Sequence, residues 1–429
     1  MKHAVLLAAL GLSACAHAPI ELTGCNLPMT RLAVPEPEPG AAISEGVMAP
    51  PASPYEALVA GALALPTTEA PGAPPPTRPV SLFLSGGSQN GAFGAGFIER
   101  WRIGNGGQLP AFRVVTGIST GALIGTTVFT GESHRAVAGY TIDSEADLLD
   151  VKARGLVNQV KAGAVGSLDP LRRRIDNLLD KQPGDDALLA DIAEANDRDG
   201  RKFIIGVVDV REGEAYAVDM TALASRWAAE PDAAKRTRIK QCYIEALVAS
   251  SSVPFAAPPV YVDGHMLVDG GVRFGVFRSA EQAGFARAVA ATRPADKALA
   301  PASFLIVNGK WEIDPQCPYE PAADGSCPAS GKLKKWDILD LGFRSIDILT
   351  NQIYRFSADA ATQGPGDHAF ARIEADAPGH VLNTRTCAEW RAIDNADNPP
   401  PVQFHKREML CLIDYGDSRS LVAEWWKRD

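Results

Sequence analysis

The stretch RVVTGISTGALIGTTVF, residues 113–129, passes from an apolar run through a tight turn into a helix of small residues. At the turn, Gly117-Ile118-Ser119-Thr120-Gly121 has the GxSxG spacing that lifts a serine hydroxyl out of the end of a strand. The flanking glycines let strand and helix approach closely, and the helix directs its positive end toward the turn. GxSxG also arises by chance in glycine-rich chains, so the strand–turn–helix setting carries the prediction. It predicts that Ser119 is a nucleophile rather than a structural serine.

Similar apolar runs on both sides of this stretch predict a sheet. Short runs at 80–84, 113–116, 203–209 and 304–307 read as buried strands, and stretches at 92–101, 122–129 and 238–249 read as helices. Strands that alternate with helices favour a mostly parallel sheet covered on both faces. We therefore expect an α/β protein with three layers, α/β/α.

A glycine-rich loop follows the first of these strands. Several backbone N–H groups can converge on one point in such a loop, and beside a nucleophile they would form an oxyanion hole. The predicted oxyanion-hole residues are Gly86, Gly87, Ser88, Gln89, Asn90 and Gly91. A nucleotide-binding loop is the alternative, but the stretch lacks the GK[ST] ending and an acidic residue at a strand end about 20 residues on.

A third motif, Asp269-Gly270-Gly271, follows the short apolar run 266–268. A nucleophilic serine needs a base within hydrogen-bond reach, and we expect Asp269 to be that base. Asp263-Gly264, just upstream, reads as a hairpin turn. An alternative is a triad of the α/β-hydrolase order Ser, Asp, His. Its histidine would be His265, His368, His380 or His405.

In this order the three motifs resemble the patatin-like phospholipases, and the resemblance covers about residues 80–280. It implies a three-layer α/β/α fold, a Ser119–Asp269 dyad and hydrolysis of lipid acyl esters without a metal or other cofactor. The residues that match the family's motif glycines are Gly117, Gly121, Gly270 and Gly271, and the segment 249–258 resembles the family's Ala-Ser-rich stretch. Ser88 stands where the family often has glycine, and Asn90 where it often has a basic residue. A non-catalytic envelope scaffold is the remaining alternative.

The first fifteen residues predict export. Lys2 precedes an apolar run too short to span a bilayer, and small residues follow it, as in a secretory signal peptide. Residues 12–15, Leu-Ser-Ala-Cys, resemble the lipobox of bacterial lipoproteins. That resemblance implies cleavage after Ala14, acylation of Cys15 and, with Ala16 next, an outer-membrane anchor. A plain signal peptide is the alternative.

Composition divides the rest of the chain. Residues 30–78 are rich in Pro, Ala and Glu, which predicts an extended spacer, with one docked helix at 55–65. The expected parts are a signal peptide at 1–14, a lipidated tether at 15–79, a catalytic domain at 80–300, and an extension at 301–429 that completes or covers it. An amphipathic helix around 339–356 is expected to bury its Phe and Tyr residues in the core.

Net charge and cysteine usage limit the possible binding partners and the cellular compartment. A net charge of −9 argues against nucleic acid. The run Arg172-Arg173-Arg174 is expected to be a solvated helix face. Besides Cys15, six cysteines remain, which suits disulfides in an oxidising compartment. Closeness in the sequence favours the pairs Cys317–Cys327 and Cys387–Cys411. None of the cysteines has CxxC spacing, so a metal site is not expected.

Overall fold

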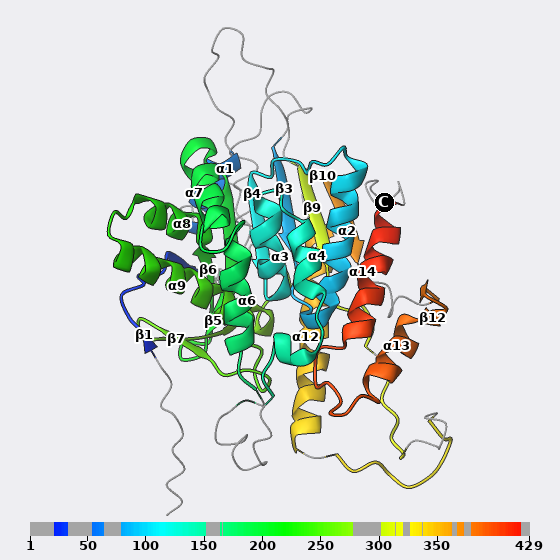
Figure 1. Ribbon diagram of the computed structural model, residues 1–429. Helices are drawn as coiled ribbons and strands as arrows, with labels where there is room; N and C mark the ends of the chain where they lie inside the picture. Colours follow the sequence, from blue (N-terminus) through cyan, green and yellow to red (C-terminus); the bar gives the residue numbers. More distant parts are fainter. Residues whose placement is uncertain are drawn as a thin grey trace, which may run out of the picture.

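The computed structural model describes residues 21–32, 54–63, 79–151, 164, 166–277, 302–313, 315–320, 327–336, 338–362, 367–372 and 379–421 (Figure 1). The predicted signal peptide, Cys15 and most of the predicted tether lie outside these residues. Within the described part, no helix is long and apolar enough to cross a membrane.

A sheet of ten strands forms the centre of the molecule, in the order β1-β7-β8-β5-β4-β3-β9-β10, with β6 beside β5 and β2 beside β6. Its strands are β1 Glu21–Leu22, β2 Met29–Arg31, β3 Val80–Leu84, β4 Val114–Ile118, β5 Lys202–Asp209, β6 Glu214–Asp219, β7 Val260–Val262, β8 His265–Asp269, β9 Ala302–Val307 and β10 Asp367–Arg372. The run β10-β9-β3-β4-β5 is parallel, whereas β6 and β8 pair antiparallel with β5. The predicted mostly parallel central sheet is confirmed. Because β3 and β4 are parallel neighbours, the loops that follow them meet at one edge.

The two faces of the sheet belong to different cores. Along β3, Leu82 and Leu84 pack into one core and Phe83 into the other, because successive side chains of a strand point to opposite faces. The first core is covered by the helices α2 Gly91–Gly104, α3 Thr120–Phe129, α4 His134–Tyr140, α6 Asp169–Leu179, α7 Ala187–Asp199, α8 Met220–Ala229, α9 Ala233–Ser250 and α14 Lys406–Ser420. The second is covered by α1 Pro54–Leu63 and residues 274–277. Helices, sheet and helix give the expected three layers (Figure 1).

The remaining elements lie around this body. They are the helices α12 Ile338–Thr362 and α13 Cys387–Asp394, the hairpin β11 Val381–Leu382 with β12 Arg385–Thr386, and the 3-10 turns η1 Ser88–Asn90, η2 Glu145–Asp147 and η3 Gly270–Val272. The helix predicted at 238–249 begins earlier, as α9, because the Asp232 carboxylate caps it by accepting the Lys235 N–H at 2.9 Å.

Two stretches of the predicted tether belong to the folded body instead. Residues 21–32 supply β1 and β2, and Cys25 is joined to Cys242 of α9 by a disulfide. The Asp263 carboxylate accepts the backbone N–H groups of Gly24 and Asn26 at 2.5 and 2.6 Å. Residues 21–32 are therefore joined to the body by strand pairing, by the Asp263 carboxylate and by a disulfide, and they are not a spacer. The expected helix at 55–65 is confirmed as α1.

Side-chain contacts and burial test three further predictions from the sequence. The pairs Cys317–Cys327 and Cys387–Cys411 are confirmed. The arginine run is a solvated face only in part: Arg173 is exposed, but Arg172 donates two bonds to Glu245 at 2.7 and 2.9 Å and Arg174 donates to backbone carbonyls. The expected burial of the aromatic residues of α12 is confirmed for Tyr354 and wrong for Phe356, which is 68% exposed.

Candidate active site

The turn between β4 and α3 holds Ser119 in a strained conformation, with φ 54° and ψ −124°. A positive φ costs a residue with a Cβ about 1 to 3 kcal/mol, and such strain gathers at functional sites. The glycines on either side are required by space. A Cβ on Gly121 would lie 2.5 Å from the carbonyl oxygen of Leu84, and one on Gly117 would meet the backbone of Gly121.

The C-terminal end of α9 is hydrogen-bonded to this turn. The Ser250 hydroxyl accepts the Ser119 N–H at 3.0 Å and donates to the carbonyl of Gly206 at 2.7 Å, which ties the turn to β5. Two residues on, the carbonyl of Ser252 accepts the N–H of Asp269 at 3.1 Å. The Ala-Ser-rich segment 249–258 therefore holds both predicted catalytic residues by their backbones.

Asp269 lies at the end of β8, and its carboxylate lies near enough to the Ser119 hydroxyl for that hydroxyl to lower the pKa of Asp269. The carboxylate accepts the N–H of Gly271 at 2.7 Å. Asp269 is only 4% exposed, and this burial raises its pKa to about 7 against the opposing effects of the Ser119 hydroxyl and the Gly271 N–H. Gly270 is required here because a Cβ would lie 2.8 Å from the carbonyl oxygen of Gly206.

The glycine-rich loop lies directly beside the serine, since a Cβ on Gly86 would be 3.3 Å from the Cβ of Ser119. Buried Asn308, after β9, holds the loop's start: its N–H donates to the Ser85 hydroxyl at 2.8 Å and its side-chain amide to the Ser85 carbonyl at 2.9 Å. Two predicted donors point elsewhere. The Asn90 N–H donates to the Gly87 carbonyl at 3.0 Å, and the Gly91 N–H donates within η1. The N–H groups of Gly86, Gly87, Ser88 and Gln89 are left as the better candidates.

The Gln89 side chain is turned away from the serine and into the C-terminal helices. Its amide donates to Glu408 of α14 at 3.0 Å, and its oxygen accepts the N–H of His405 at 2.8 Å. Glu408 also accepts from Arg391 of α13 at 2.7 Å. Sequence reasoning missed this anchor because the partners are more than three hundred residues apart.

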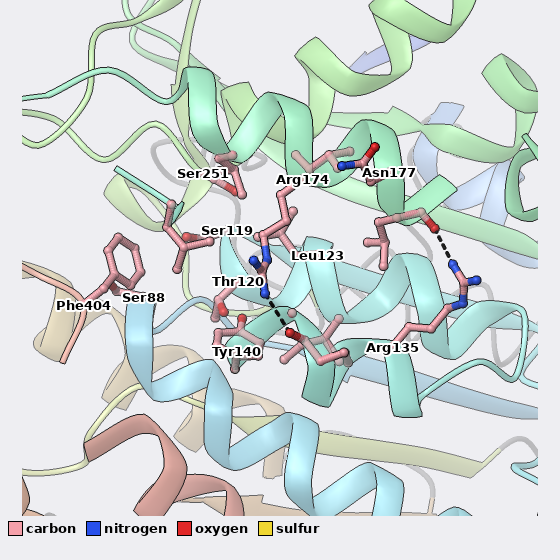
Figure 2. A pocket seen from close by; sticks show the side chains of 18 of the residues that line it. Ser88, Ser119, Thr120, Leu123, Arg135, Tyr140, Arg174, Asn177, Ser251 and Phe404 are labelled. Carbon is pink, nitrogen blue, oxygen red and sulfur yellow. Dashed lines mark hydrogen bonds between the residues drawn. The ribbon is translucent and has the colours of Figure 1, made fainter. Parts of the chain in front are cut away.

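A cavity of about 520 Å³ opens beside Ser119 between α3, α4 and α6. Figure 2 shows Ser119, Ser88 and Phe404 at one end of it and Arg135 and Asn177 at the other. Most of the wall is apolar, with Leu123, Ile124, Ala136, Leu148, Leu171 and Ile175 among the lining residues. Its size and apolar wall suit a hydrophobic ligand group with its polar end at the serine.

The two arginines of this wall are committed to the backbone. Arg174 donates to the carbonyls of Ala138 and Thr141 at 2.7 and 3.0 Å, and Arg135 donates to those of Leu178 and Asp180 (Figure 2). They tie α4 to α6 and so fix the width of the cavity.

The candidate triad histidines have other partners. His265 lies 2.7 Å from Asp209, His380 lies 2.8 Å from Asp414, and His405 contacts Gln89. The side chain of His368 lies outside the described residues. Among the described residues, no histidine is hydrogen-bonded to Ser119.

One group of side chains could bring three ligand atoms to a cation: Asp209, Glu212 and His265. Asp209 is already paired with the Arg211 guanidinium at 3.5 Å, and Glu212 accepts from the Tyr216 hydroxyl. The group lies at the turn after β5. The structure assigns it no part in the chemistry at Ser119.

A strained serine after a parallel strand, a buried carboxylate near it and an apolar cavity on an α/β/α sheet are features that a lipid hydrolase of the patatin class would need. The comparison with family models agrees: residues 82–278 match the model described as patatin-like phospholipase, so this domain of the chain is similar to that family. Comparison with curated proteins gives no match. Among solved structures, the crystal structure of VipD from Legionella pneumophila is similar at 12% identity, covering 83% of this chain and 70% of VipD. Its TM-score of 0.26 is too low to support an argument.

Proposed function

We propose that the protein hydrolyses acyl esters of lipids, of the phospholipase A or lysophospholipase type, through a Ser119–Asp269 dyad. The observation that carries this proposal is the buried Asp269 carboxylate close to the Ser119 hydroxyl, beside an apolar cavity. An acyl chain would lie between α3, α4 and α6, with its ester carbonyl at Ser119.

In the proposed first step, ionised Asp269 accepts the hydroxyl proton as the Ser119 oxygen attacks the acyl carbonyl carbon. N–H groups among those of Gly86, Gly87, Ser88 and Gln89 would hold the oxyanion, which typically contributes about 100- to 1000-fold per donor. The proton then passes to the departing alcohol oxygen, and the acyl group remains on Ser119. Water, deprotonated by Asp269, releases the fatty acid and restores the hydroxyl. The raised pKa of Asp269 makes it a stronger base than an ordinary carboxylate once it is ionised.

Hydrolysis of a panel of phospholipid, lysophospholipid and simple esters tests the proposal. Ser119→Ala should lower turnover at least about a thousandfold, and Asp269→Asn comparably, because the nucleophile and its base act as one unit. Ser81→Ala is the matched control, since this β3 serine is also buried and its hydroxyl has no partner among the described residues. Turnover that survives Ser119→Ala would refute the mechanism. Absence of both turnover and labelling by a fluorophosphonate would favour a non-catalytic scaffold.

We also propose that the chain is exported and anchored in the bacterial envelope, in the outer membrane, through an acylated Cys15. Its three disulfides support an oxidising compartment. Palmitate labelling of the full chain in a bacterial host, compared with Cys15→Ser, tests the anchor. A wild-type chain that takes up no label would contradict it.

A further inference from the structure

Tyr354 of α12 fills a socket made by glycines from separate segments. A Cβ on any of four of them would come within 3.0 Å of this side chain, at its oxygen for the first two and at a ring carbon for the others. The four are Gly86, Gly271, Gly275 and Gly309. Any larger residue at these places would push the ring out, so the backbone is shaped to the tyrosine.

Two of these glycines belong to the candidate active site. Gly86 is the glycine of the oxyanion loop that lies against Ser119, and Gly271 donates its N–H to the Asp269 carboxylate. The phenol oxygen therefore lies between the loop that would hold the oxyanion and the loop that orients the base. None of the described side chains of α12 lines the cavity, so Tyr354 approaches the dyad from outside the proposed acyl site.

Polar bonds on the same face of α12 fix the helix around the tyrosine. One turn before it, the Asn351 amide donates to the carbonyls of Lys310 and Trp311 at 2.6 and 3.2 Å. One turn after it, the Ser357 hydroxyl accepts the N–H of Gly275 at 2.9 Å. Spacing of three residues keeps all three side chains on one helix face. The ring is thus held from both sides and cannot slide along the socket.

The groups that face Asp269 are neutral. They are the Ser119 hydroxyl after β4, the N–H of Gly271 in η3 and the phenol of Tyr354 from α12, while the Ser252 carbonyl holds its backbone. Burial, and then the charge of Asp269, raise the pKa of Tyr354, so the phenol does not ionise in the working range. In the described part of the chain no cation offsets the burial of Asp269. The groups that cover the Asp269 carboxylate therefore determine how far its pKa is raised.

We propose that Tyr354 is a positioning residue: by filling the glycine socket it holds the oxyanion loop and the Asp269 loop together and keeps water from the carboxylate. This inference rests on the proposed function, since it assigns Tyr354 a role in the same reaction. A tyrosine that only filled the core would affect stability and leave the pH dependence of turnover unchanged.

The test is the pH profile of kcat/KM for a soluble ester, measured on the full chain. Wild type should gain activity across about pH 7 as Asp269 ionises. Tyr354→Leu should lower kcat at least about tenfold, change KM less than about threefold, and move that midpoint at least about one pH unit toward acid as water reaches the carboxylate. Tyr354→Phe, which keeps the ring, should retain the wild-type midpoint. Phe356→Ala, on the exposed side of the same helix, is the matched control.

Gly309→Ala supplies a second route to the same result. It changes no atom of the dyad, yet its Cβ would displace the ring. It should therefore move the midpoint in the same direction as Tyr354→Leu. Folded variants with the wild-type midpoint would overturn the inference. If neither variant folds, a folded Tyr354→Phe variant whose midpoint moves by more than about one unit still overturns the inference.

The same assay separates this inference from the proposed function. If wild-type turnover does not depend on Ser119, the proposed function fails and the role of Tyr354 fails with it. If turnover depends on Ser119 but the midpoint is insensitive to the socket, only the role of Tyr354 is wrong.

Discussion

Replacing Asp269 by asparagine is expected to make the folded protein more stable in alkaline solution and to change its stability little at about pH 4. In the folded protein, burial raises the pKa of this carboxyl from 3.8 to about 7. In the unfolded chain it would ionise near its ordinary value. The folded state therefore holds the proton more tightly than the unfolded state does.

The sign and size of the effect follow from this difference. Stability from the neutral carboxyl is fully present below the pKa of the unfolded chain and is lost as the pH rises through the folded pKa. Each pKa unit is worth about 1.4 kcal/mol, so a shift of about three units lowers the free energy of unfolding by about 4 kcal/mol at about pH 9. Asparagine stays neutral, and its amide can still bond Ser119 and accept the N–H of Gly271.

Urea unfolding at about pH 4 and about pH 9, with the disulfides intact, measures this difference. Asp269→Asn should exceed wild type by about 4 kcal/mol at the higher pH and by less than about 1 kcal/mol at the lower. Asp199→Asn is the control of opposite sign, because the hydrogen bond from Arg198 lowers the pKa of Asp199 and its stabilisation is present only above the unfolded pKa. An equal gain in the free energy of unfolding for Asp269→Asn at both pH values would refute the raised pKa of Asp269.

Three more predictions concern packing, the cavity and the disulfides. Gly121→Ala should lower the free energy of unfolding by about 1 to 3 kcal/mol, because its Cβ would meet the carbonyls before the oxyanion loop. A melting temperature equal to that of Gly61→Ala, where space is free, would contradict this. Leu123→Trp should reduce hydrolysis of a long-chain ester about tenfold more than that of an acetate ester, because the indole would fill the cavity beside Ser119; equal losses would place the acyl chain elsewhere. Removing the Cys25–Cys242 bond should cost about 5 kcal/mol and removing Cys387–Cys411 about 3, because the bridged residues are 217 and 24 positions apart. The reverse order in urea unfolding would show that loop entropy does not govern these bonds.

The local structure of the candidate site could be predicted from sequence because each motif is local. A strand, a tight turn and a helix follow one another within residues 113–129, and their side-chain pattern specifies Ser119 without knowledge of the rest. The loop at 86–91 follows its strand in the same way. What local pattern could not show is the fate of each N–H: Asn90 bonds within the loop, and only the three-dimensional turn reveals it.

Long-range partners could not be predicted. Residues 21–32 fell within the predicted tether at 15–79, yet Cys25 is bonded to Cys242 and short β1 gains its hydrogen bonds from β7. Tyr354 read as an ordinary core residue of an amphipathic helix. The proposed role of Tyr354 depends on four glycines in distant segments, and no sequence periodicity connects them to it. Phe356 fitted the apolar stripe of the same helix and is nevertheless exposed.

The order of strands in the sheet has a practical consequence for anyone who wishes to express the protein. A fragment cut to residues 82–278 would omit β9, which pairs with β3 along its whole length, and β1 and β2 from the other end of the chain. Such a fragment would expose the backbone of a buried, apolar strand to the solvent, where it can pair with other chains and aggregate. Useful boundaries should therefore start before residue 21 and extend beyond α14, and a failed short fragment would say nothing about whether the protein is an enzyme.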